Sequence, residues 1–187
     1  MPKTRIAILI SGRGSNMAAL IYAARAADCP YEIALVTGDK PAAPGLDLAA
    51  AEGVPIERLA YDKTTFFEQL NALLSERAID VIALAGFMRI IPATLVDRWA
   101  GRLVNIHPSL LPKHRGIDTH AAVLAAGETT TGATVHLVTA KLDDGPILGQ
   151  VEVAVLPGDT AETIAARVLI AEHQLYPRTL AAFVSRA

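Results

Sequence analysis

An asparagine and a histidine two positions apart, Asn105 and His107, end a short apolar run, and Pro108 follows them. Side chains two positions apart on a β-strand project from the same face, so the amide and the imidazole are expected side by side. Such a pair is suited to holding an oxyanion and transferring a proton. A structural role, in which each side chain bonds only nearby backbone, is the alternative that the spacing leaves open.

Two adjacent carboxylates, Asp143 and Asp144, precede Gly145 and Pro146 between two runs that are expected to be strands. Such a string is first of all a turn signal. A carboxylate on this loop could also reach the strand ends and orient or charge His107, as a third group does in many catalytic sites. Both roles stay open on the residues alone.

A glycine-containing loop, residues 11–16 with the sequence SGRGSN, joins the first apolar run to a helical pattern. Glycines let backbone N–H groups approach an anion, and a helix N-terminus favours negative charge. Met17 stands where a dinucleotide fingerprint has its third glycine, and the Gly-Lys-Ser/Thr sequence of a Walker loop is missing. A monophosphate is therefore favoured over NAD or ATP, and a tight turn capped by Ser15 or Asn16 is the alternative.

The elements that would position these residues alternate through the first half of the chain. Strands are expected at residues 6–10, 32–37, 81–85 and 103–106, and helices after Asn16 and over residues 66–74. This alternation predicts an α/β fold with a mostly parallel twisted sheet of Rossmann-like type and helices on both faces.

The second half adds two strand-like runs, residues 133–138 and 147–156, which are joined by a short connection. A connection this short predicts an antiparallel addition at one side of the sheet. A final helix is expected to open at Asp159 and Glu162, which resemble a capping box, and to end at Pro177. No repeat or linker interrupts the pattern, so a single domain over residues 1–187 is expected.

Composition narrows the class of protein. The 187 residues are 52% hydrophobic and carry a formal net charge of −2, which disfavours nucleic acid as the main partner. No apolar run approaches a membrane span, and Cys29 as the only cysteine fits a reducing cytoplasm. The other histidines lack the close pairing or cysteine partners of a zinc site, so no metal is expected; they are His114, His120, His136 and His173.

Five segments resemble the glycinamide ribonucleotide formyltransferases of purine biosynthesis, in the order that this family has them. They are ISGRGSN (residues 10–16), LAGFMRII (84–91), NIHPSLLP (105–112), LDDGP (142–146) and EHQLYP (172–177). The resemblance covers nearly the whole chain. It implies a cytoplasmic enzyme that transfers the formyl group of 10-formyltetrahydrofolate to the amine of glycinamide ribonucleotide, with small-molecule partners and no membrane; it leaves a homodimer open.

The resemblance also implies roles for individual residues. The catalytic trio would be Asn105, His107 and Asp143, with Asp144 at a variable position. The substrate phosphate would be held by Gly14, Ser15 and Asn16, and Glu172 would lie at the glycinamide and ribose side. The folate pocket would be lined by Met88, Arg89, Ile90, Ile91, Val138, Thr139, Ala140, Lys141, Leu142 and Asp143. Two positions depart from the pattern: Lys63-Thr64, where some members have an arginine for the folate tail, and Leu169, where some have a glutamine.

The implied mechanism is direct attack of the neutral amine on the formyl carbon. Asn105 and a protonated His107 would hold the oxyanion, and Asp143 would favour that protonation and help to relay the proton. Two related enzymes are rivals, methionyl-tRNA formyltransferase and formyltetrahydrofolate hydrolase, but each usually carries an additional domain. A non-catalytic binder of a phosphorylated metabolite is the rival from another class.

Overall fold

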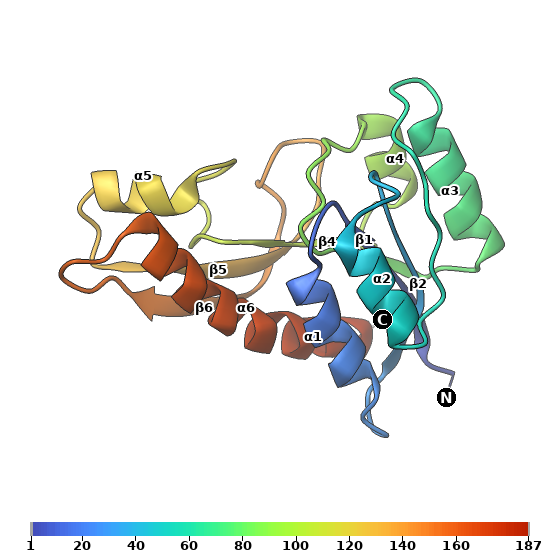
Figure 1. The fold of residues 1–187 in the computed structure, drawn as a ribbon, viewed down its shortest axis with the longest axis horizontal. Coiled ribbons are helices and arrows are strands. Elements are labelled where there is room, and N and C mark those ends of the chain that lie inside the picture. Colours follow the sequence, from blue (N-terminus) through green and yellow to red (C-terminus); the bar gives the residue numbers. More distant parts are fainter. Residues whose placement is uncertain (1, 187) are drawn as a thin grey trace.

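Six strands form a single sheet in the order β2-β1-β3-β4-β5-β6 (Figure 1). The computed structural model describes residues 2–186. The parallel part contains β1 (Thr4–Ile10), β2 (Tyr31–Gly38), β3 (Val81–Leu84) and β4 (Leu103–His107). The antiparallel part adds β5 (Thr130–Leu137) against β4 and β6 (Ile147–Ala154) against β5. The predicted mixed sheet is therefore confirmed.

Helices cover both faces of the sheet. They are α1 (Ser15–Ala24), α2 (Pro44–Ala51), α3 (Phe66–Glu76), α4 (Ala93–Arg98), α5 (Thr119–Ala125) and α6 (Ala161–Val184). Alternate residues of β1 point to opposite faces: Ile8 packs in a core with α1, α2 and α6, whereas Leu9 packs in a second core with α3 and α4. Burial on both faces explains why this strand is an uninterrupted apolar run. Figure 1 shows α1 and α6 lying beside one another along the first of these faces.

The expected limits of the last helix were wrong at both ends. Thr160 caps α6, because its hydroxyl accepts the N–H of Thr163 and the Thr163 hydroxyl accepts the N–H of Thr160. Asp159 instead forms an ion pair with Arg167. Pro177 lies inside the helix, which continues to Val184. The next two turns bury apolar side chains in the core, and this burial outweighs the backbone hydrogen bond that proline cannot make.

Two further expectations need correction. The last strand, β6, ends at Ala154 rather than at residue 156. Three helices, α2, α4 and α5, were not expected; each has only six to eight residues, too few for a clear helical repeat in the sequence.

The order of the strands determines where a ligand can bind. The chain leaves β1 to form β2 on one side and later returns to form β3 on the other side, so β1 and β3 flank a topological switch point. Open α/β sheets bind ligands outside the carboxyl ends of their strands at such a point. The glycine loop follows β1, residues 85–92 follow β3, and His107 ends β4. All three segments therefore border the same edge of the sheet.

Candidate active site

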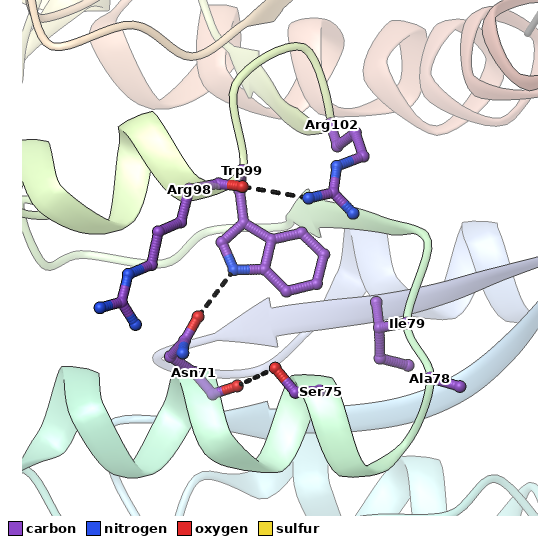
Figure 2. Close-up of a pocket in the computed structure, with 7 residues that line it drawn as sticks. All are labelled: Asn71, Ser75, Ala78, Ile79, Arg98, Trp99 and Arg102. Atoms are coloured by element: carbon purple, nitrogen blue, oxygen red, sulfur yellow. Dashed lines mark hydrogen bonds between the residues drawn. The ribbon is translucent and has the colours of Figure 1, made fainter.

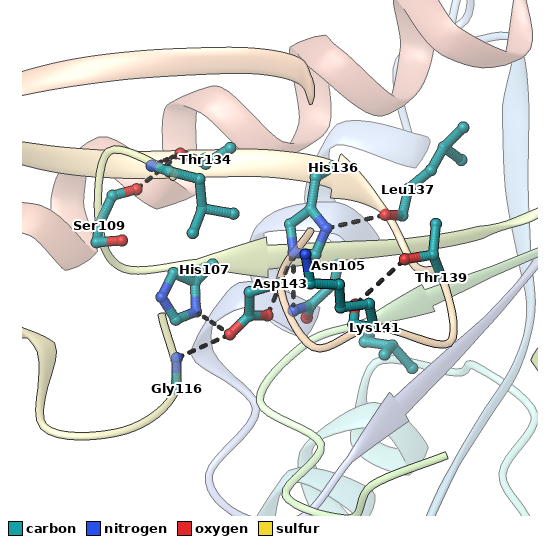
Figure 3. Close-up of polar contacts among 12 residues, drawn as sticks. Asn105, His107, Ser109, Gly116, Thr134, His136, Leu137, Thr139, Lys141 and Asp143 are labelled. Carbon is teal, nitrogen blue, oxygen red and sulfur yellow. Dashed lines mark hydrogen bonds and ion pairs between the residues drawn. The ribbon is translucent and has the colours of Figure 1, made fainter. Parts of the chain in front are cut away.

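The antiparallel pairing of β4 with β5 places four polar side chains in two cross-strand pairs. Asn105 lies opposite His136, and His107 lies opposite Thr134 (Figure 3). Residues that alternate along a strand share a face, so all four project from the same side of the sheet. The expectation that Asn105 and His107 share a face is therefore confirmed.

Asp143 reaches this face from the loop between β5 and β6. Its carboxylate is 8% exposed, and Oδ2 lies 3.5 Å from Nδ1 of His107. The same oxygen accepts the backbone N–H of Gly116 at 2.9 Å, while Oδ1 lies 3.6 Å from Nε2 of His136. Asp143 has a left-handed backbone conformation, with φ 47°. The loop thus brings the third member of the predicted trio beside the other two (Figure 3).

Both ring nitrogens of His107 face oxygen atoms. Nδ1 faces Asp143, and Nε2 lies 2.8 Å from the backbone carbonyl oxygen of His114. A carbonyl oxygen only accepts hydrogen bonds, so Nε2 donates. The ring therefore has an oxygen partner at each nitrogen.

Asp144 faces away from this cluster although it is adjacent to Asp143. It pairs with Arg115 and, at 2.8 Å, with the Lys141 ammonium group. The hydrogen bond from Lys141 is the main cause that lowers the pKa of the Asp144 carboxyl, with Arg115 adding to it. Neighbouring aspartates therefore have different surroundings, one among buried histidines and the other among surface cations.

The glycine loop forms the start of α1 through its backbone. Gly14 is the N-cap with φ 74° and ψ 35°, and no side chain within residues 2–186 caps the helix. The first N–H groups of the helix can therefore bind an anion. Ser11 joins this loop to the segment after β3: its N–H donates to the Gly86 carbonyl, and its hydroxyl accepts the N–H of Met88 at 2.9 Å.

Asn16 connects the glycine loop to α6. Its side-chain amide donates to Glu172 at 2.6 Å, and the Glu172 carboxylate is only 6% exposed. Burial raises the pKa of Glu172, although the hydrogen bond from Asn16 opposes that change. Two predicted substrate residues are thus in direct contact. This bond uses one of the two N–H groups of the Asn16 amide.

The first predicted folate segment, residues 88–91, lies on the surface after β3. Met88 is 70% exposed and Ile90 is 82% exposed, whereas Arg89 is held in place. The Arg89 guanidinium donates to the buried carboxylate of Asp39 at 2.6 Å and lies 3.9 Å from the centre of the Tyr61 ring. This segment therefore combines exposed apolar side chains with one fixed cation.

The second predicted folate segment, residues 138–143, runs along β4. Val138 lies beside the start of that strand, where its N–H donates to the Leu103 carbonyl, and Asp143 lies near its end. Leu142 between them is largely exposed. The structure therefore places only the later part of this segment next to the cluster of Asn105, His107 and Asp143.

Some residues at the site were not expected from the sequence, above all His136, Ser11 and Asp39. The sequence offers His136 only as a metal ligand, and its spacing from the other histidines does not support that role. The signal that could have found it is register, because aligning the predicted antiparallel strand with residues 103–107 places it opposite Asn105. Among residues 2–186, no group of three or more His, Cys, Asp or Glu side chains is placed to hold a metal ion.

A pocket of about 370 Å³ lies elsewhere, between α3 and α4 (Figure 2). Its lining residues are Asn71, Ser75, Ala78, Ile79, Arg98, Trp99 and Arg102. Ile79 precedes β3 and Arg102 precedes β4, so the pocket borders the amino ends of these strands. It is therefore at the opposite edge of the sheet from His107.

Comparison with known proteins identifies the class. The sequence pattern of the formyl transferase family matches residues 4–180. The chain therefore belongs to the formyl transferase family, which confirms the resemblance that its motifs indicate. No helix in the described part of the chain is long and apolar enough to cross a membrane.

Individual relatives narrow the comparison within the family. Phosphoribosylglycinamide formyltransferase of Escherichia coli (strain K12) is 41% identical over 95% of this chain and 86% of its own length. The crystal structure of phosphoribosylglycinamide formyltransferase from Brucella melitensis has a TM-score of 0.93 and 47% identity, covering 97% of this chain and 96% of that one. The trifunctional purine biosynthetic protein adenosine-3 of Bos taurus is 42% identical over 99% of this chain, which spans 19% of that protein.

Proposed function

We propose that this chain is a phosphoribosylglycinamide formyltransferase, which transfers the formyl group of 10-formyltetrahydrofolate to the amine of glycinamide ribonucleotide in purine synthesis. The observation that carries the proposal is the cluster of Asn105, His107 and Asp143 beside the carboxyl end of a strand. Relatives with this activity in their names cover nearly the whole chain and are themselves nearly covered by it.

The catalytic role of this cluster follows from its chemistry. The neutral amine attacks the formyl carbon, and the carbonyl oxygen becomes an oxyanion as the new C–N bond forms. Fixed N–H donors stabilise such an oxyanion more than they stabilise the ground state. Asn105 supplies one donor from its amide, and a protonated His107 supplies a second. Asp143 balances the imidazolium charge and relays the proton that the amine loses, directly or through water. When the oxyanion collapses, the bond between the formyl carbon and N10 of the folate breaks, and N10 takes up this proton as tetrahydrofolate leaves.

Substrate binding requires His107 to exchange one partner. Its Nε2–H donates to the carbonyl of His114, and its Nδ1 faces Asp143. For the ring to donate to the oxyanion while keeping Asp143, the oxyanion takes the place of the His114 carbonyl. The segment that contains His114 and Gly116 therefore adjusts when the substrates bind.

The distance between the two ends of the site fits a ribonucleotide. The glycine loop follows β1, and His107 ends β4, with β3 between these strands. Two strand spacings amount to about 10 Å, which a sugar and its substituents can span. The phosphate binds the backbone N–H groups of Gly14, Ser15 and Asn16, and Glu172 lies beside the ribose and glycinamide.

The formyl donor occupies the exposed apolar surface that residues 88–91 and 138–143 contribute. Met88, Ile90 and Leu142 present large apolar side chains to solvent there. Arg89 retains N–H groups beyond the one that Asp39 accepts, and these can meet an anionic part of the folate.

The deciding experiment follows the loss of 10-formyltetrahydrofolate by absorbance, with and without glycinamide ribonucleotide. The proposal expects turnover only when both are present, together with stoichiometric formation of the formylated ribonucleotide. Turnover without the ribonucleotide would instead identify a hydrolase. Binding of both compounds without turnover would identify a non-catalytic binder.

A further inference from the structure

β5 carries two buried polar side chains opposite the two catalytic residues of β4. Thr134 is fully buried opposite His107, and His136 is 1% exposed opposite Asn105. Buried polar groups in folded proteins nearly always have hydrogen-bond partners. The partners of these two side chains identify what each one holds in place.

Thr134 holds the chain that follows His107. Its hydroxyl donates to the carbonyl of Ser109 at 2.7 Å and accepts the N–H of Leu111 at 3.0 Å. The Gln150 side-chain amide donates to the same hydroxyl at 2.9 Å. A hydroxyl has one hydrogen and two lone pairs, so all its capacity is used. The turn after β4 is thus fixed by the neighbouring strand.

A backbone carbonyl determines which ring nitrogen of His136 carries the hydrogen. Nδ1 lies 2.9 Å from the carbonyl oxygen of Leu137, which can only accept, so Nδ1 carries a hydrogen. Burial lowers the pKa of His136 and so does His107, while the Leu137 carbonyl and Asp143 oppose the change. The ring is therefore neutral near pH 7, and Nε2 presents a lone pair.

That lone pair determines the orientation of the Asn105 amide. Nε2 of His136 lies 3.3 Å from Nδ2 of Asn105, and only an N–H can face it favourably (Figure 3). Rotating the amide by 180° would bring Oδ1 against the same lone pair. Within residues 2–186 the Asn105 amide makes no other hydrogen bond to a side chain, so His136 is the group that distinguishes its two ends.

We propose that His136 is a positioning residue for formyl transfer: its Nε2 accepts one N–H of Asn105 and thereby directs the second N–H toward the oxyanion. The inference rests on the proposed function, because it assigns a task to Asn105 in that reaction. Without His136 the amide would be free to turn its oxygen toward the developing negative charge, which is repulsive. His136 acts through Asn105 and touches neither substrate.

Two substitutions of His136 test the roles of its two ring nitrogens separately. In His136→Gln the side-chain oxygen can occupy the position of Nε2 and accept from Asn105. In His136→Asn the shorter amide can replace Nδ1 but leaves Asn105 without its acceptor. The expected kcat of His136→Asn is lower by about 10²-fold, the size of losing an oxyanion donor. His136→Gln is expected to stay within about tenfold of the unmodified enzyme, with KM for both substrates nearly unchanged in each variant.

A double-mutant cycle distinguishes positioning from general support of the fold. If His136 acts through Asn105, His136→Asn should cost almost nothing further in the Asn105→Ala background, because interacting residues are strongly non-additive. Additive losses, or near-normal kcat in His136→Asn alone, would overturn the proposal. Equal loss in the Gln and Asn variants would overturn it as well.

A measurement without substrate keeps this inference separate from the proposed function. The ¹⁵N chemical shifts of a neutral imidazole distinguish a nitrogen that bears hydrogen from one with a lone pair. In the unmodified protein labelled at histidine, His136 should show hydrogen on Nδ1 and a lone pair on Nε2 at pH 7. Hydrogen on Nε2 would overturn the role of His136 even if the enzyme transfers formyl groups. The expected tautomer in an enzyme that only hydrolyses the folate would overturn the proposed function but support the hydrogen bond from Asn105 to Nε2 of His136.

Discussion

The glycine loop and the carboxyl end of β4 border the same edge of the sheet. Backbone groups form the site at the glycine loop, whereas side chains form the site at the end of β4. At the glycine loop the backbone creates the site: Gly14 has a left-handed conformation, and no described side chain caps the helix that follows. At the end of β4 side chains create it. His107 faces Asp143 and the His114 carbonyl, while Asn105 faces His136.

Because of this difference, we expect the glycine loop to serve substrate binding and the end of β4 to serve the chemical step. N–H groups at a helix start can donate to a phosphate without breaking a side-chain contact. At β4 the side chains of the proposed trio already have partners, so in the proposed reaction the substrates would replace some of them. Side-chain changes near β4 should therefore alter turnover, and changes at the glycine loop should alter affinity.

The largest expected effect is that of Asp143→Asn, which removes the charge facing His107 and nearly preserves volume. Turnover should fall by about 10² to 10⁴, the size of a general acid–base contribution, while both KM values change little. Steady-state kinetics across pH, with thermal unfolding to verify the fold, measures this.

Asp144→Asn is the matched control for that change. The Asp144 carboxylate pairs with Arg115 and Lys141 at the surface, and exposed ion pairs contribute little. Its turnover should stay close to normal. Two similar and mild losses would reduce the loop to a structural turn, and a severe loss confined to Asp144→Asn would show that the trio is misassigned.

Asn105→Ala should lower kcat by about 10² to 10³, because one donor to the oxyanion is lost. Affinity for both substrates should change much less, since the donor acts mainly in the transition state. Single-turnover kinetics at saturating substrate measures the chemical step directly. Near-normal turnover in a folded variant would make Asn105 structural and would remove the contrast between the two regions.

The parallel half of the fold could be predicted because its signals are local. Residues 6–10 form an apolar run that is buried on both faces, and the glycine loop follows immediately. The short helices and the end of α6 could not be predicted in the same way. Pro177 reads locally as a helix end, but the helix continues because Leu180 and Val184 are buried against the sheet.

The same distinction between local signals and distant contacts applies to the candidate site. Asn105 and His107 could be paired from strand periodicity, which depends only on residues two apart. His136 could not be assigned a role in this way, because its contact with Asn105 joins residues 31 positions apart and depends on the register of β4 with β5. The residues alone allowed a carboxylate of the loop beside His107, and the family resemblance selected Asp143 for that position and added Glu172.

Gly12→Val tests the backbone region with a smaller expected effect. A Cβ added at Gly12 would have no atom within 4 Å apart from its chain neighbours, so a side chain there should extend into open space without disturbing the fold. KM for the ribonucleotide should rise roughly 10-fold to 100-fold, the worth of a hydrogen bond to a charged group. Unfolding temperature and KM for the folate should hardly change, which thermal unfolding and steady-state kinetics measure.

Gly14→Val provides the contrast, because a side chain at that position would be strained. Gly14 has φ 74°, and an added Cβ would lie 3.0 Å from the end of the Met17 side chain. This variant should lose stability as well as affinity. If a folded Gly14→Val variant bound the ribonucleotide normally, the phosphate would have to bind elsewhere.

The smallest expected effect is a difference in how the two regions respond to acid. Burial lowers the pKa of His136, so on acidification below the ordinary value near 6.5 the unfolded chain takes up a proton before the folded one. Its stabilising contribution is complete above pH 6.5 and is lost as pH falls through the folded pKa. Burial raises the pKa of Glu172, so there the folded chain takes up the proton first and gains stability as pH falls toward 4.5.

Two variants should therefore change the pH dependence of stability in opposite directions. Between pH 7 and 5.5, His136→Gln should reduce the loss of unfolding free energy by at most about 1.4 kcal/mol per pH unit, the limit for one proton. Glu172→Gln, which can still accept from Asn16, should steepen that loss by removing an opposing contribution. Because His120 and His173 also have pKa values lowered by burial, some loss should persist in both variants. Urea unfolding at several pH values measures these slopes.

Unchanged slopes would mean that neither His136 nor Glu172 is as buried in solution as its contacts imply. The contrast between the backbone-built region and the side-chain-built region would then rest on the kinetic measurements alone.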